Sequence, residues 1–158
     1  MNSLLNMLPA LLPYAYAYAE KHQALILEKG LPLTTEELAD ARRAGVKEPE
    51  KIRRLCVLAL PEPDNDDVLF AAKRSGLFQL GSSGLTLGHG IFLRQDAWNS
   101  RLILVHECVH VGQYERLGIR PFLDMYVREC IDPGYPFGAL EQEAILVSRD
   151  ICKSSPET

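Results

Sequence analysis

The sequence predicts an α+β domain in which a small sheet lies beside several helices. Segments with helical features occupy both ends of the chain, and short segments with strand features lie between them. The chain has 158 residues, 47% of them hydrophobic, which is enough for one hydrophobic core and too little for two independent ones. We therefore expect a single domain over residues 1–158.

Two helices are predicted in the N-terminal third. Pro13 suits the first turn of a helix, and residues 14–29 then run without a breaker to the next glycine. Thr34 is followed three residues later by Glu37, the spacing of a capping box, in which each side chain accepts a hydrogen bond from the other residue's backbone N–H. This pattern predicts a second helix, which begins after Thr34 and ends before Gly45.

The middle of the chain predicts strands around one short helix. Residues 52–60 are rich in Val, Leu and Ile and end at a Pro-Glu-Pro-Asp turn, so we expect a strand. Residues 66–75 have helical character. A glycine-rich segment then predicts two further strands, over residues 85–87 and 91–93, separated by a Gly-His-Gly break. The glycines indicate a bulge or a close approach of the backbone to another group.

Three more helices are predicted in the C-terminal part. Asn99 or Ser100 can cap a helix whose apolar positions continue as far as Gly118. Residues 121–130 and 140–152 follow as two further helices, separated by a segment rich in proline and glycine. The first of these three helices carries the motif that indicates a metal-binding site.

That motif is His106-Glu107-Cys108-Val109-His110, which matches H-E-x-x-H. Side chains four residues apart share one face of a helix, so the two imidazoles can be aimed at one ion, and the pair suits Zn²⁺. Glu107 would stand beside the metal-activated water and act as general base. The alternative is a surface helix that carries these residues by chance. The apolar neighbours argue against it, because buried imidazole and carboxylate groups are costly unless paired or metal-bound.

A catalytic zinc site takes three protein ligands, so a third ligand has to come from elsewhere in the chain. The remaining histidines are His22 and His89, and His89, alone in a glycine-rich loop, is expected to be exposed. The stronger candidates are Glu141 and Glu143 on the last predicted helix. They are two residues apart, about 200° around the helix, so both cannot easily reach one ion. The other carboxylate is expected to face solvent.

The motif and residues 140–144 together resemble the gluzincin class of zincin metallopeptidases. Proteins of that class pair H-E-x-x-H with a glutamate on a downstream helix, commonly as E-x-x-A with the first glutamate as ligand. The resemblance implies Glu141 as the third zinc ligand, with Ala144 packed under the site and Glu143 facing solvent. It also implies a zincin-like fold, with an edge strand beside the active-site helix. Many members carry an aspartate after the alanine, where this chain has Ile145.

A second resemblance covers roughly the C-terminal half of the chain. Residues 84–91, 104–118, 122–126 and 134–136 are similar to a group of small uncharacterised bacterial proteins with predicted metallopeptidase sites. It implies a site rather than a substrate. In zincins the strand before the active-site helix pairs with an extended substrate, which makes residues 86–93 a candidate for that role, or equally an ordinary strand.

Supporting groups can be placed around the motif. Tyr135 is the best-placed donor to a developing oxyanion and Tyr126 the second, the alternative for each being a packed ring with a satisfied hydroxyl. Gln113 shares the helix face of His110 and could steady a ligand. Cys108 points away from that face, so a buried, inert thiol is expected.

Composition excludes several classes of protein. The net charge is −4 and the basic residues occur as scattered pairs, so no nucleic-acid partner is expected. The four cysteines lie far apart with no C-x-x-C pair, which indicates reduced thiols. The apolar residues 4–19 follow no basic residue and contain Pro9 and Pro13, which argues against a signal peptide or membrane span. We expect a cytoplasmic protein without a membrane partner. Nothing in the sequence defines its oligomeric state.

These observations favour a zinc-dependent hydrolase, most simply a metallopeptidase acting on a peptide or protein substrate. The chemistry would be that of a zinc-activated water with Glu107 as general base. One alternative is a metal-binding structural or interaction module without turnover. Another is hydrolysis of a non-peptide amide, because the same groups can attack other carbonyls.

Overall fold

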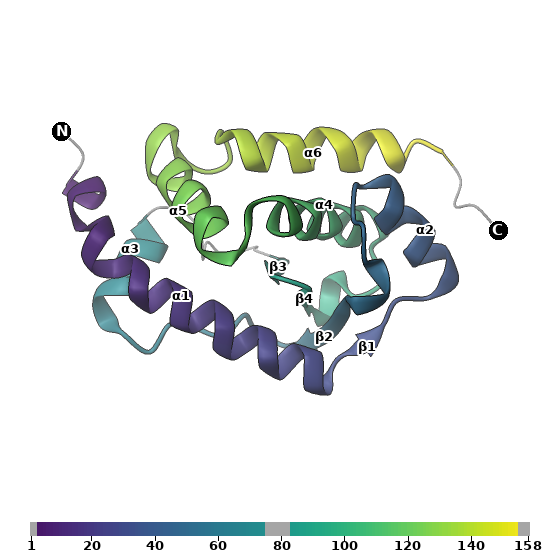
Figure 1. The fold of residues 1–158 in the computed structure, drawn as a ribbon, viewed down its shortest axis with the longest axis horizontal. Helices are drawn as coiled ribbons and strands as arrows, with labels where there is room; N and C mark the ends of the chain where they lie inside the picture. Colours follow the sequence, from purple (N-terminus) through teal and green to yellow (C-terminus); the bar gives the residue numbers. More distant parts are fainter. Residues whose placement is uncertain (1–2, 75–82, 155–158) are drawn as a thin grey trace.

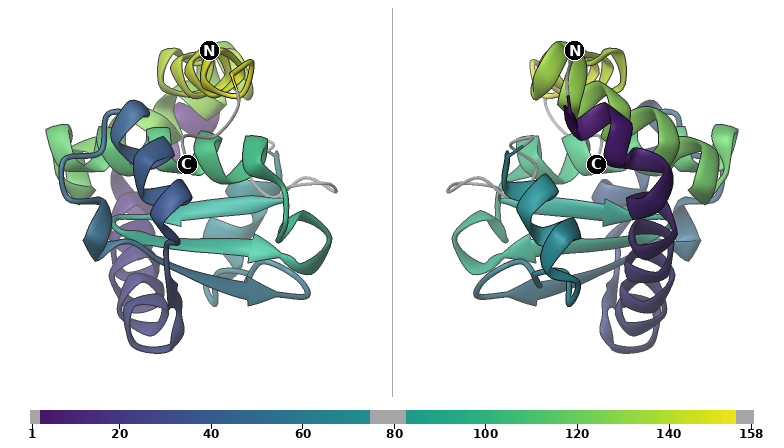
Figure 2. Two further views of the ribbon diagram at one scale, coloured as in Figure 1. Left: turned by 90° about the vertical axis from the view of Figure 1, so that its right-hand side faces the viewer. Right: turned by 90° about the vertical axis from the view of Figure 1, so that its left-hand side faces the viewer.

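The structure is a computed structural model that describes residues 3–74 and 83–154. The described residues form six α-helices around a four-stranded mixed sheet of order β1-β2-β4-β3. In Figures 1 and 2, α1 packs across one face of the sheet, α4 lies on the other, and α6 runs along the far side of α4. The predicted α+β class is confirmed.

The first helix is longer than predicted. α1 spans Ser3–Lys29 and therefore contains Pro9 and Pro13 in its interior, whereas the sequence predicted a start at Pro13. Each proline removes one backbone donor and crowds the preceding turn, which normally ends a helix. Burial of side chains from the early turns outweighs that cost, since tertiary packing contributes most of the stability of a helix in a protein. The buried residues of these turns are Leu4, Leu8 and Leu11.

The second helix and its cap are confirmed. α2 spans Thr35–Arg43, the Thr34 hydroxyl accepts from the Glu37 backbone N–H, and the Glu37 carboxylate accepts from the Thr34 N–H. Gly45 then adopts a φ of 101°, a left-handed conformation that glycine takes without strain. The strand before this helix, β1 (Leu31–Pro32), was not predicted, because two residues carry no readable period.

The sheet places one strand beside the motif helix. β2 (Arg53–Val57) runs parallel to β4 (Gly90–Arg94), and β3 (Gly84–Leu87) runs antiparallel to β4 at the edge of the sheet. The two glycine-flanked strands are confirmed to within one residue. The predicted strand at residues 52–60 is too long, because Leu58 is 84% exposed and lies outside the sheet.

The remaining helices follow the prediction closely. Ser100 caps the motif helix α4 by accepting a hydrogen bond from the backbone N–H of Ile103, and Gly118 ends it. A short π-helical segment lies between the last two helices. The bounds are α3 Asp66–Arg74, α4 Arg101–Leu117, α5 Ile119–Glu129, η3 Cys130–Gly134 and α6 Ala139–Ile151, with short 3-10 turns at η1 Pro49–Lys51 and η2 Gln95–Ala97. Ser75, the last residue predicted for α3, lies outside the described residues.

The core lies on both faces of β4, as expected for a strand whose successive side chains point to opposite faces. Ile91 and Leu93 pack in one cluster with apolar residues of α4, and Phe92 packs in a second cluster with Ile26 of α1. The sheet therefore holds α4 rigidly from one side.

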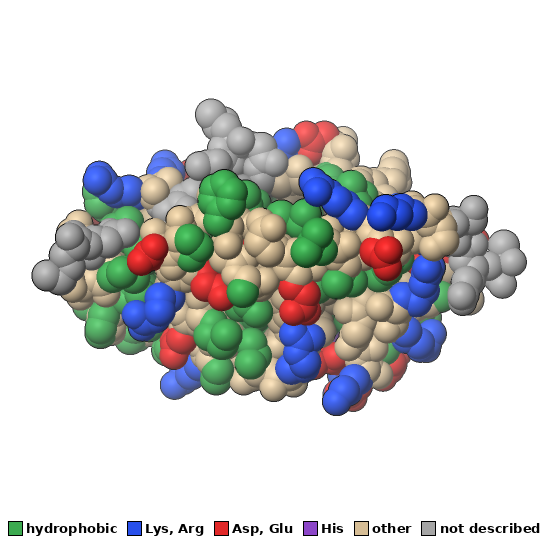
Figure 3. All heavy atoms as spheres, turned by 90° about the horizontal axis from the view of Figure 1, so that it is seen from above, with side chains coloured by type: hydrophobic (Ala, Val, Ile, Leu, Met, Phe, Trp, Pro, Cys, Tyr) green, Lys and Arg blue, Asp and Glu red, His purple; other side chains and the backbone are tan. Residues whose placement is uncertain are grey.

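Acidic and basic side chains are mixed on the face of the molecule that carries α6. Viewed from the side of α6, hydrophobic side chains are scattered among acidic and basic ones (Figure 3). Within residues 3–74 and 83–154, no helix is both long and apolar enough to cross a membrane. The cysteines are free, with Cys108 and Cys130 buried.

Candidate metal centre

Three predicted ligands come together between α4 and α6. His106 and His110 lie one turn apart on α4, and Glu141 lies in the first turn of α6, which packs against α4. The Nε2 atom of His106 is 2.8 Å from Oε1 of Glu141, and that of His110 is 3.1 Å from Oε2. One ligand atom from each residue lies within 4.8 Å of the others. This group could hold a metal ion.

The charges of the group favour a cation. Burial alone would raise the pKa of Glu141, but hydrogen bonds from the two histidines outweigh it, and the pKa lies well below its usual range. Burial alone would lower the pKa of His110, yet the neighbouring carboxylates of Glu141 and Glu107 raise it. The environment therefore stabilises positive charge at His110, whether the charge is a proton or an ion bound in its place.

Gln113 sets the tautomer of His110. Its amide Nε2 donates to the Leu140 carbonyl at 2.9 Å, which can only accept. The amide oxygen of Gln113 is thereby turned to Nδ1 of His110, 2.8 Å away, so Nδ1 carries a proton. In the metal-free site Nε2 donates to Glu141, and it is the atom that offers a lone pair to an ion bound in place of its proton. The predicted role of Gln113 in steadying a ligand fits this geometry.

Gln113→Leu is expected to weaken metal binding by roughly 10- to 100-fold, the usual cost of losing a partner behind a metal ligand. The change leaves the Nδ1 proton of His110 without an acceptor, so the ring loses its fixed orientation. Competition titration against a chromophoric chelator measures the effect. The matched control is Gln142→Leu, which removes an amide bonded to the Pro136 carbonyl; equal weakening in both variants would contradict the assignment.

Two tyrosines lie near the group. The Tyr126 hydroxyl donates to Oε2 of Glu141 at 2.8 Å, and its ring meets that of His110 edge-on at 5.5 Å. Burial and then the carboxylate of Glu141 raise the pKa of Tyr126 well above its usual value, so the hydroxyl stays a donor. Tyr135 is 37% exposed, and burial and nearby carboxylates raise its pKa to about 12. Tyr126 thus already donates to the candidate ligand Glu141, and Tyr135 stays the predicted donor to an oxyanion.

The edge strand positions Glu107. The Thr86 hydroxyl donates to Oε2 of the Glu107 carboxylate at 2.6 Å, a length typical of bonds to an ionised acceptor. Gly84, two residues earlier on the same face of β3, leaves room for this carboxylate, since a Cβ there would lie 2.9 Å from Oε1. The sequence predicted a bulge or a close backbone approach at the glycines of this segment, and Gly84 provides a close approach. It assigned no role to Thr86, for which the only available signal was the alternation of the strand.

With Glu107 as the general base that the sequence predicts, Thr86→Val is expected to lower kcat roughly 10- to 100-fold, which corresponds to about 1.5–3 kcal/mol for a hydrogen bond to a charged group. Valine keeps the shape of threonine but cannot donate, so the Glu107 carboxylate loses its orientation. Metal content measured on the same preparation should not change. Loss of metal together with activity would show instead that the variant disturbs the whole site.

Glu143 and Cys108 lie apart from the group, as predicted. The Glu143 carboxylate contacts a guanidinium nitrogen of Arg116 at 3.2 Å, and its side chain is 40% exposed. Cys108 is buried, and burial raises the pKa of its thiol far above the ordinary value. A protonated, enclosed thiol is inert.

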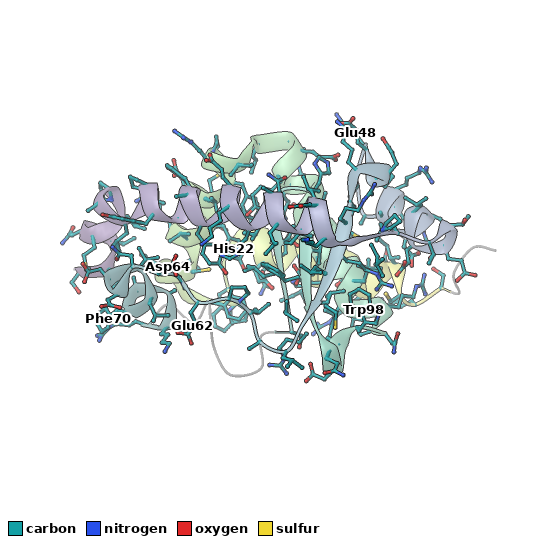
Figure 4. The ribbon with its side chains drawn as sticks, turned by 90° about the horizontal axis from the view of Figure 1, so that it is seen from below. His22, Glu48, Glu62, Asp64, Phe70 and Trp98 are labelled. Carbon is teal, nitrogen blue, oxygen red and sulfur yellow. The ribbon has the colours of Figure 1, made fainter. Side chains whose placement is uncertain are left out.

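The other two histidines have structural partners. His89 was expected to be exposed, but its ring is half-buried and its Nε2 lies 3.0 Å from the carboxylate of Glu115, which also accepts two backbone N–H groups. The prediction of a free loop histidine is wrong, because the turn between β3 and β4 folds back onto α4. His22 lies on α1 near Asp64 (Figure 4). Its ring packs on that of Phe92, with centroids 5.7 Å apart.

In comparisons with known proteins, no protein-family model, no curated protein and no solved structure matches this chain. The chemistry of the site therefore has to be argued from its own residues.

The candidate residues share one cavity of about 370 Å³. His106, Glu107, His110, Tyr135 and Glu141 all line it. The residues predicted to serve as general base, oxyanion donor and metal ligands therefore face the same space, which is what hydrolysis of a bound substrate requires.

Proposed function

We propose that the protein is a zinc-dependent hydrolase that cleaves peptide bonds. The observation that carries the proposal is the meeting of His106, His110 and Glu141 around one point, with Glu107 lining the same cavity. Two imidazoles and one carboxylate are the donor set of catalytic zinc sites such as His₂Glu, whereas Mg²⁺ and Ca²⁺ prefer oxygen ligands alone. Zn²⁺ is therefore the ion that these residues fit best.

The chain's own groups supply the proton transfers. When bound, Zn²⁺ would acidify a water and polarise the substrate carbonyl. The Glu107 carboxylate, held by Thr86, accepts the proton as the water attacks and passes it to the leaving nitrogen. The Tyr135 hydroxyl, protonated because its pKa is raised, donates to the developing oxyanion. Tyr126 keeps the Glu141 carboxylate in place.

The edge strand supports a peptide as the substrate. Consecutive residues of β3, which point to opposite faces of the sheet, line the cavity together. The cavity therefore runs along the outer edge of β3, where, within the described parts of the chain, no further strand pairs. Backbone N–H and C=O groups at such an edge can pair with an extended peptide.

The test measures metal content and hydrolysis together. Metal-free protein is titrated with Zn²⁺ and incubated with an unfolded, fluorescently labelled protein, and the products are identified by mass spectrometry. We expect peptide-bond cleavage that rises with zinc to one equivalent, that is lost in His110→Ala, and that is kept in His89→Ala. Stoichiometric zinc without cleavage would overturn the proposal in favour of a non-catalytic metal-binding module. Failure to bind zinc would overturn the metal centre itself.

A further inference from the structure

The cavity beside the metal group is larger than the proposed chemistry needs. Its volume is about 370 Å³, whereas an apolar cavity of roughly 150 Å³ holds a benzene ring. There is room for more than one ring-sized group next to the reacting atoms.

The far wall of this cavity is built by three helices that contribute no residue to the metal-binding group. α1, α3 and α5 line it with aliphatic side chains, and several of these are fixed by packing: Leu8 is 1% exposed and Leu123 is 8% exposed. The turns of α1 that contribute to the wall are those around Pro9 and Pro13. The aliphatic residues of the wall are Leu8, Leu11, Leu12, Val68, Leu123 and Val127. We define them as the apolar wall.

Charge is nearly absent from the rest of the lining. Among the described lining residues, Arg149 alone is charged apart from Glu107 and the metal-binding group, and it is exposed. A charged substrate group placed against the apolar wall would lose its hydration without gaining a partner. A large apolar group would instead remove hydrocarbon surface from water on both sides.

We propose that this site selects peptides with large apolar side chains on two alternate residues around the scissile bond, held by the apolar wall. The proposal rests on the proposed peptidase function and adds the substrate class. An extended peptide along β3 sends alternate side chains toward the same side. The volume accommodates two apolar groups, so selection extends over more than one residue of the substrate.

Binding to an inactive variant tests the proposal apart from turnover. Glu107→Gln protein, with and without zinc, is titrated with two labelled peptides of equal length and charge. They differ only at two alternate residues near the centre, which are Leu and Phe in one (the Leu-Phe peptide) and Ser and Asn in the other. Fluorescence anisotropy should show at least about 10-fold tighter binding of the Leu-Phe peptide, the lower end for one methylene group in an apolar pocket. Wild-type kcat/KM should show the same order of preference.

Two variants on α1 show whether the apolar wall is responsible. Ala15→Phe adds apolar bulk at a half-buried lining position, and Leu12→Lys adds a charge to the wall. Both are expected to remove the 10-fold preference, and Ala15→Phe introduces no polar group that could unfold the protein. The matched control is Leu25→Lys on the same helix, 39% exposed and outside the cavity, which should keep the preference. Thermal melts by circular dichroism verify that each variant is folded.

The outcomes separate this proposal from the function on which it rests. Equal binding and cleavage of the two peptides would overturn the apolar selection and leave the peptidase intact. Selective binding without cleavage of any peptide would support the apolar site and overturn the peptidase function. A preference that survives both Ala15→Phe and Leu12→Lys would overturn the role of the apolar wall.

Discussion

Glu107→Gln is expected to lower kcat by roughly 10²- to 10⁴-fold, the usual contribution of a general base, while zinc stays bound. Glutamine has nearly the shape of glutamate and can still accept the Thr86 hydrogen bond, but it cannot take a proton from the attacking water. Zinc stays because Glu107 is not one of the three residues that form the metal-binding group. Single-turnover kinetics and metal analysis of one preparation give both quantities.

The matched control for this variant is Glu143→Gln. It makes the same chemical change at an exposed carboxylate that pairs with Arg116, so its kcat should equal that of the wild type. Full activity in Glu107→Gln would show that another group accepts the proton. Loss of zinc in Glu107→Gln would place Glu107 among the ligands and overturn the arrangement described above.

Glu141→Gln is expected to weaken zinc binding by more than the roughly 10- to 100-fold that loss of an outer partner costs. A neutral amide removes the negative charge that both histidines face at 2.8 and 3.1 Å. It also offers one acceptor atom where the carboxylate has two, and Tyr126 already uses Oε2. Chelator competition measures the zinc affinity, again with Glu143→Gln as the control.

Replacing Glu141 is also expected to lower the stability of the metal-free protein. Glu141→Ala leaves His106, His110 and Tyr126 without their acceptor in a buried site, and an unsatisfied buried donor costs about 1–3 kcal/mol. The free energy of unfolding in denaturant should fall by an amount of this order.

One outcome would contradict the zinc-binding prediction for Glu141→Gln. If Glu143→Gln lost zinc and Glu141→Gln kept it, Glu143 rather than Glu141 would be the metal ligand.

Local spacing explains why much of this site was predictable. His106 and His110 are one helical turn apart, so their common face follows from the helix alone, and the capping box at Thr34 and Glu37 follows in the same way. The strands around the Gly-His-Gly turn were readable because two short, mainly apolar runs, residues 85–87 and 91–93, lie next to glycines. In each case the partners lie within a few residues along the chain.

Contacts between distant segments were not readable. The pairing of Thr86 with Glu107 and that of His89 with Glu115 depend on how β3 and β4 lie on α4. The start of α1 at Ser3 depends on burial of its early turns, which outweighs two prolines that locally favour a stop. Local helix propensity predicts a start at Pro13, and tertiary packing moves the start of the helix to Ser3.

The sequence by itself determined the α+β class, the helix that bears H-E-x-x-H and the residue types available to a metal, because these follow from period and spacing. Helix spacing left Glu141 and Glu143 open, and the resemblance implied Glu141. Only the tertiary structure shows that Glu141 faces the histidines, since that depends on the rotation of α6 against α4. The apolar wall was also visible only in the tertiary structure, because it is formed by three helices that are far apart in the chain. The physical reason is the same for both: such contacts join surfaces whose relative placement is set by the packing of the whole core.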